Sequence, residues 1–163
     1  MKSKLLFKVV PLLLVFMLSL TIVRGLVCVG YANYPEVTVT NVYWGTTTKP
    51  VQASPGDLND KLNIVIQNSG SEDIYSINAE LYLENTPFKN VFGEKKAVSG
   101  FAGVLQVGGT TTLSFNLNID PNAKLGEYSL PLKLHVTTRS YLTPVDLSLD
   151  VKVPLHGKVR FSI

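Results

Sequence analysis

The chain has 163 residues, of which 45% are hydrophobic, with a formal net charge of +3, two histidines and a single cysteine. One cysteine excludes a disulfide-stapled scaffold, so apolar burial has to supply the stability. The first 32 residues hold four basic groups and no acidic one, which leaves the rest of the chain at −1. The basic balance therefore does not indicate nucleic-acid binding, and we expect no nucleic-acid partner.

Residues 1–32 have the layout of a secretory signal peptide. Lys2, Lys4 and Lys8 precede an apolar run over residues 9–23, and Gly30 and Ala32 then form a small-x-small cleavage site. The run is shorter than the roughly 20 residues of a spanning helix. We predict cleavage after Ala32 and export of the remainder to the cell surface or extracellular space. The alternative is an uncleaved signal anchor that attaches the protein to a membrane.

The exported part alternates apolar and polar residues, as strands with one buried face do. In chain order the pattern covers residues 35–45, 62–68, 79–84, a glycine-bounded stretch before residue 107, and residues 111–119, 126–136 and 145–153. Turn formers separate these runs at residues 54–57, 68–73, 107–110 and 120–126. We therefore predict an all-β protein. Its single domain, residues 33–163, is an antiparallel β-sandwich of about seven to eight strands, preceded by an N-terminal hydrophobic helix.

Trp44 and Tyr43 lie near the end of the first predicted strand. A tryptophan in this position more often packs against the edge of a sandwich than binds a ligand, so we assign Trp44 a structural role.

The segment of residues 84–96 interrupts the alternation and is long for a hairpin. It combines aromatic and basic side chains, and loops at the end of a sandwich often recognise partners. The candidate partner-binding residues are Phe88, Lys89, Phe92, Lys95 and Lys96. The alternative is that both phenylalanines fold back over the core, which spares the cost of exposing them.

A turn, Gly126 and Tyr128 open the strand of residues 126–136. This arrangement is similar to that of immunoglobulin-like and fibronectin-type sandwiches, in which the tyrosine hydroxyl bonds to upstream backbone. Residues 37–153 as a whole resemble the immunoglobulin-like repeat of archaeal surface-layer and surface-layer-associated proteins, a relative of the bacterial cell-adhesion-related sandwich. The resemblance implies an immunoglobulin-like fold and a structural role for Gly126 and Tyr128.

The sequence offers few groups for catalysis or metal binding. His135 alternates with apolar neighbours and is expected to face solvent, and His156 lies near the C-terminal end. No cysteine or second histidine stands at metal spacing, and no phosphate-binding or nucleophile motif occurs. Four acidic residues near turns leave a calcium site as an alternative: Asp57, Asp60, Glu72 and Asp73. We predict no enzyme activity, no cofactor and no metal.

Residues 158–163 resume the alternation after Pro154 and Gly157, with Val159, Phe161 and Ile163 on one side. We predict an edge strand here. It either folds back onto its own sandwich, which is favoured because it costs less entropy, or pairs with a neighbouring chain.

These features predict a non-catalytic, exported module that works by protein contact in an archaeal-type cell envelope. Its expected partners are envelope or surface-layer proteins, itself included, and the membrane if the leader is retained. Two alternatives stay open: a pilus or filament subunit that assembles by strand exchange, and a glycan- or substrate-binding accessory module of an exported enzyme or transporter.

Overall fold

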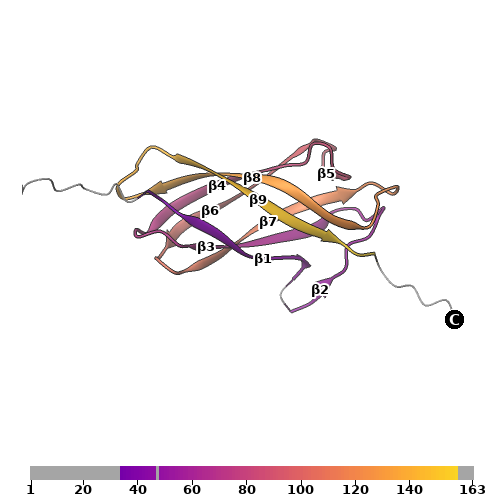
Figure 1. Ribbon diagram of the computed structural model, residues 1–163, viewed down its shortest axis with the longest axis horizontal. Helices are drawn as coiled ribbons and strands as arrows, with labels where there is room; N and C mark the ends of the chain where they lie inside the picture. The colour runs from indigo at the N-terminus through magenta and orange to yellow at the C-terminus, as the bar shows by residue number, and fades with distance from the viewer. Residues whose placement is uncertain (1–33, 47, 158–163) are drawn as a thin grey trace, which may run out of the picture. The chain divides into compact units, whose positions relative to one another are not determined.

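The computed structural model describes residues 34–46 and 48–157, which form nine strands in two antiparallel sheets (Figure 1). The predicted all-β sandwich is confirmed for these residues. The predicted N-terminal helix and the predicted strand over residues 158–163 lie outside them.

The first sheet has the order β2-β1-β3-β7-β5. Its strands are β1 (Val37–Gly45), β2 (Pro50–Val51), β3 (Asp60–Asn68), β5 (Phe88–Asn90) and β7 (Thr110–Ile119). The two edge strands are very short, with two residues in β2 and three in β5. Most of the outer edges of β1 and β7 therefore carry no neighbouring strand in the described part of the chain.

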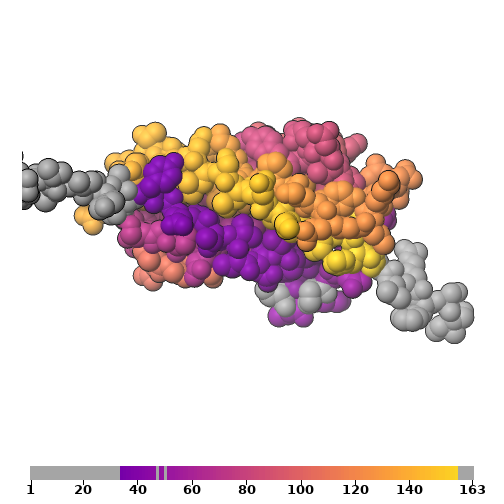
Figure 2. All heavy atoms as spheres, in the orientation of Figure 1, coloured from indigo at the N-terminus to yellow at the C-terminus, as the bar shows by residue number. Residues whose placement is uncertain are grey.

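The second sheet has the order β6-β4-β8-β9. Its strands are β4 (Ile74–Tyr82), β6 (Lys96–Leu105), β8 (Gly126–Thr138) and β9 (Val145–Leu155). The long hairpin of β8 and β9 pairs from Gly126 with Leu155 to Val136 with Val145 without a register shift. On the face shown in Figure 2, β1 (indigo) lies next to β9 (yellow), so these two strands line one side of the sandwich.

The alternating side chains of the two sheets form one core. In β8, for example, Leu130, Leu132, Leu134 and Val136 face inward and are at most 1% exposed. Burial of such residues stabilises the fold by about 1.5–3 kcal/mol each, before the entropy of ordering the chain is subtracted.

Two differences from the sequence prediction have local causes. β4 begins at Ile74, before the predicted residue 79. The first part of the strand was missed because a register shift between Ile74 and Ser76 breaks the period of two. β5 lies inside the segment that was predicted to be irregular, because Phe88 and Asn90 face the interior. Neither a bulge nor a three-residue strand leaves a regular pattern in the sequence.

Candidate functional site

Trp44 joins the two sheets, as a structural residue should. Its side chain is 3% exposed, and its Nε1 donates a hydrogen bond of 2.8 Å to the carbonyl of Pro154 on β9. Its ring packs on Phe88, with 5.9 Å between the ring centroids. Because Trp44 and Pro154 belong to different sheets, this contact closes one side of the sandwich near the C-terminal end of β9.

Tyr128 lies at the corner where the chain crosses from β7 to β8. Its hydroxyl donates to the carbonyl of Lys124 at 2.6 Å, the bond expected of a corner tyrosine. Its ring meets Phe88 edge-on, with centroids 5.3 Å apart. Gly126 begins the strand with a φ of +152°, a conformation that side-chain-bearing residues rarely adopt. Both residues therefore shape this corner.

Phe88 is the main correction to the predicted contact residues. It is fully buried in β5 between Trp44 and Tyr128, so it belongs to the core and cannot contact a partner. Phe92 behaves differently, because 86% of it is exposed. The expectation that phenylalanine folds back over the core thus holds for Phe88 and fails for Phe92.

The three lysines of the segment also differ in their contacts. Lys95 donates from Nζ to the carbonyls of Thr86 at 2.6 Å and Phe88 at 3.0 Å, so it fastens the loop internally. Lys96 pairs with Glu80 at 3.0 Å. Lys89 is exposed and lies on β5. Of the five candidates, Lys89, Phe92 and Lys96 are exposed, and Lys96 is already paired with Glu80.

We call residues 91–95, which connect β5 to β6, the Phe92 loop. Its conformation is fixed by Asn90, which the sequence analysis did not single out. The Asn90 side-chain oxygen accepts the backbone N–H of Phe92 and of Glu94, both at 2.9 Å. Its amide donates to the Glu94 carboxylate at 2.7 Å and to the Lys96 carbonyl at 2.9 Å. An asparagine with both ends used in this way holds a loop rigid.

A hollow of about 400 Å³ lies beside the Phe92 loop. Its walls include Val91, Phe92 and Val98, together with Lys61, Ser114 and Asn116. Lys61 and Asn116 are neighbours in the β3–β7 register, and their alternation with buried residues places both on the outer face of the first sheet. The alternation in the sequence indicates that Lys61 and Asn116 face outward, but it does not indicate that they lie beside Phe92.

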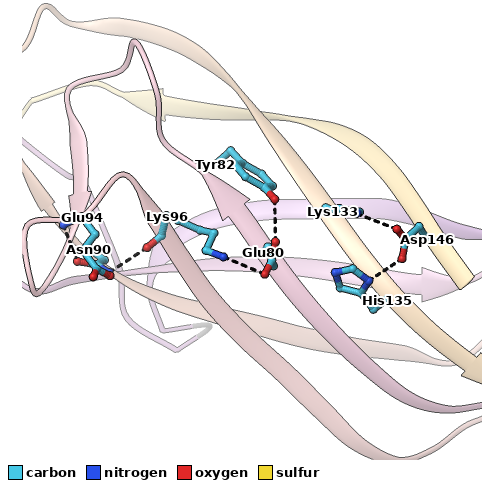
Figure 3. A network of polar contacts seen from close by, with 8 residues as sticks. All are labelled: Glu80, Tyr82, Asn90, Glu94, Lys96, Lys133, His135 and Asp146. Atoms are coloured by element: carbon cyan, nitrogen blue, oxygen red, sulfur yellow. Dashed lines mark hydrogen bonds and ion pairs between the residues drawn. The ribbon is translucent and has the colours of Figure 1, made fainter. Parts of the chain in front are cut away.

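The outer face of the second sheet carries a row of polar contacts (Figure 3). Glu80 accepts from the Tyr82 hydroxyl at 2.7 Å and from Lys96, which together lower the pKa of its carboxyl group. Asp146 lies between Lys133 at 2.7 Å and His135 at 2.6 Å. These two bonds, that of Lys133 first, lower the pKa of Asp146.

The acidic residues and histidines considered for metal binding and catalysis make local contacts. Asp57 accepts the Ser54 N–H, Asp73 accepts the Val107 N–H, and Glu72 bonds to Ser140, so these carboxylates hold turns together. Within residues 34–46 and 48–157 no group of three potential metal ligands converges. His135 bonds to Asp146 on the sheet surface, and His156 is exposed. No helix among the described residues is long and apolar enough to cross a membrane.

No family model and no curated protein matches the sequence. Solved structures that are similar to the chain include the C-terminal domain of wzt, with a TM-score of 0.44, 10% identity and 78% of each chain covered. Another is a beta-D-glucoside glucohydrolase from Trichoderma reesei, with a TM-score of 0.31, 11% identity and 74% of this chain covered. The match covers 19% of the glucohydrolase chain. Such distant likenesses carry no conclusion about function.

Proposed function

We propose that this protein is an exported, non-catalytic, immunoglobulin-like module that acts by contact with other proteins of a cell envelope. The immunoglobulin-like assignment is supported by the strand order β1-β3-β7 facing β6-β4-β8-β9 and by the tyrosine at the β7–β8 corner. Export is supported by the basic and apolar leader of residues 1–32.

One observation carries the contact role: Phe92 is 86% exposed on a loop that Asn90 and Lys95 hold in place. A flexible loop would turn its aromatic ring inward or pay entropy on binding, whereas a fixed loop presents the ring ready for a partner. Aromatic side chains of this kind are frequent anchors at the centre of protein interfaces. Val91 and Val98 extend the apolar surface beside it.

The test replaces Phe92 with a photo-crosslinking amino acid in the full chain, produced in cells that export it. The matched control carries the same amino acid at Leu142, which is 82% exposed on the β8–β9 connection. The proposal predicts one defined adduct with an envelope protein from position 92 and none from position 142. Adducts of equal yield and identity at both positions, or no adduct at 92, would contradict it.

The hollow favours a second candidate, the glycan-binding accessory module. An exposed aromatic ring with Lys61 and Asn116 beside it offers both a stacking surface and polar groups for hydroxyl or carboxylate groups of a sugar. A glycan array separates the two candidates. Binding of one glycan class that is lost in Phe92→Ala and in Asn116→Ala would replace the protein partner with a glycan.

A further inference from the structure

The strands β1 and β9 border a side of the sandwich that is incompletely closed. We call the space between the outer edges of these two strands the β1–β9 seam. On β9, the inward residues Leu147 and Leu149 are only half-buried, and on β1 the same is true of Val39 and Val42. The corresponding residues of β8, one strand further in, are at most 1% exposed. The inward side chains in the first half of β9 are therefore only partly covered by the first sheet.

A hollow of about 420 Å³ lies in the seam, bordered by Tyr34, Val37, Leu147 and Leu149. Its far end is closed, because Trp44 binds the carbonyl of Pro154 there. The bond also shows which backbone groups face the seam. Since successive residues of a strand direct their N–H and C=O groups to opposite sides, the even-numbered residues from Asp146 to Lys152 present theirs to the seam. An additional strand would find hydrogen-bonding groups along this edge.

We propose that the β1–β9 seam is completed by the segment of residues 158–163 from a second copy of this chain. Its alternating Val159, Phe161 and Ile163 would enter the seam over Leu147 and Leu149, and its backbone would pair with β9. This surface is separate from the Phe92 loop, so the proposal does not depend on the proposed function.

A simple turn would bring the chain's own segment to a part of β9 that does not border the hollow. Gly157 donates its N–H to Ala53 and has a φ of +75°, so any reversal occurs after Leu155. The tightest turn that points the apolar row inward sets Val159 opposite Leu155, Phe161 opposite Val153 and Ile163 opposite Val151. Those three β9 residues are already at most 1% exposed. A looser turn moves the segment further from Leu147 and Leu149, whereas a segment from another copy has no such restriction.

Charge supports the same site. The outward row of β9 reads Asp146, Ser148, Asp150 and Lys152. Asp146 is already paired with Lys133 and His135, so Asp150 and Glu36, which is exposed at the border of the hollow, supply the acidic charge here. The polar row of the segment carries Lys158 and Arg160, so the basic row would lie against the acidic edge. The other outer edge of the second sheet, that of β6, is less suitable. It has a register shift that disrupts its far end, and Lys61 lines the hollow beside its start.

The contact joins two different surfaces of the same chain, which makes it heterologous. Such contacts produce rings when the rotation between copies closes, and open chains of subunits when it does not. The prediction is therefore assembly beyond the single chain, with every copy both giving and receiving a strand.

The experiment compares the sedimentation of full chains, isolated in their exported form, over a series of concentrations. The wild type is expected to assemble as concentration rises. Deletion of residues 158–163 should leave a monomer with an unchanged melting temperature. Asp150→Lys should weaken assembly by about fivefold, since like charges then meet across the strand pair. Adding Lys158→Glu and Arg160→Glu to Asp150→Lys should restore it. Glu84→Lys, on the β4–β5 connection, is the control that should change nothing.

Three results would overturn the proposal. A wild type that stays monomeric at every concentration excludes the assembly. A deletion that lowers the melting temperature of the monomer assigns the segment to its own sandwich. Assembly that needs residues 158–163 but ignores the charge reversals places the contact elsewhere than on β9.

Discussion

At the scale of single residues, the cluster of Trp44, Phe88 and Tyr128 decides how the two sheets meet. Trp44 and Phe88 come from the first sheet and Tyr128 from the second, and each ring contact spans about 5–6 Å between centroids. The sequence indicated the roles of Trp44 and Tyr128 because both stand beside a strand end or a turn. For Phe88 it left contact with a partner and burial in the core both open, because the burial depends on a strand of only three residues.

Tyr128→Phe should lower the free energy of unfolding by about 1 kcal/mol, because the hydrogen bond to the Lys124 carbonyl is lost while the ring packing stays. The loss is small because solvent reaches this carbonyl and hydrates it. Urea denaturation measures the effect. An unchanged midpoint would show that the bond does not stabilise the corner.

Phe88→Ala and Phe92→Ala form a matched pair with opposite outcomes. Removal of the buried Phe88 ring should cost about 3–5 kcal/mol, since it leaves a cavity between Trp44 and Tyr128. Removal of the exposed Phe92 ring should change stability by no more than about 0.5 kcal/mol. Thermal unfolding of both variants checks the pair, and similar melting temperatures would contradict the assignment of Phe92 to the surface.

At the scale of elements, the Phe92 loop depends on Asn90. Asn90→Ala removes the acceptor of two backbone N–H groups and should cost about 1–3 kcal/mol. Hydrogen exchange at the amides of Phe92 and Glu94 should then accelerate. Asn116→Ala, an exposed change on β7, is the control. Unchanged exchange at both amides in Asn90→Ala would mean that the loop is held by something else.

The polar row on the second sheet predicts how stability depends on pH. Asp146 and Glu80 have pKa values lowered from 3.8 and 4.5, so their contribution is present above those unfolded-state values and is lost as pH falls through the folded-state values. Stability should therefore decline on acidification below about pH 4. Asp146→Asn should reduce this decline, measured as the urea midpoint at pH 7 and pH 3. An identical decline in the variant would show that Asp146 does not contribute.

At the scale of the whole molecule, the sandwich could be predicted because β3, β7, β8 and β9 alternate clearly and Gly, Pro, Asn and Asp mark the turns between strands. Sheet membership, the bulge in β4 and the strand β5 could not, because they arise from pairing between distant segments. For the candidate surfaces, too, the sequence indicated one part and the fold was needed for the other. Phe92 was singled out from the sequence, but its separation from Phe88 and its support by Asn90 required the fold.

The Phe92 loop and the β1–β9 seam can contact envelope components only if the chain is exported from the cytoplasm. We propose that residues 1–32 direct export, and we predict that the exported chain begins at Asn33.

Intact-mass measurement on the natively expressed protein, combined with cell fractionation, tests this most directly. We predict a chain that starts at Asn33 and is found in the envelope or outside the cell. A chain that keeps its leader and stays in the membrane fraction after washing with salt and carbonate would show that the leader is an uncleaved anchor, while the proposal of export would stand. A chain that starts at Met1 and stays in the cytoplasm would contradict the account.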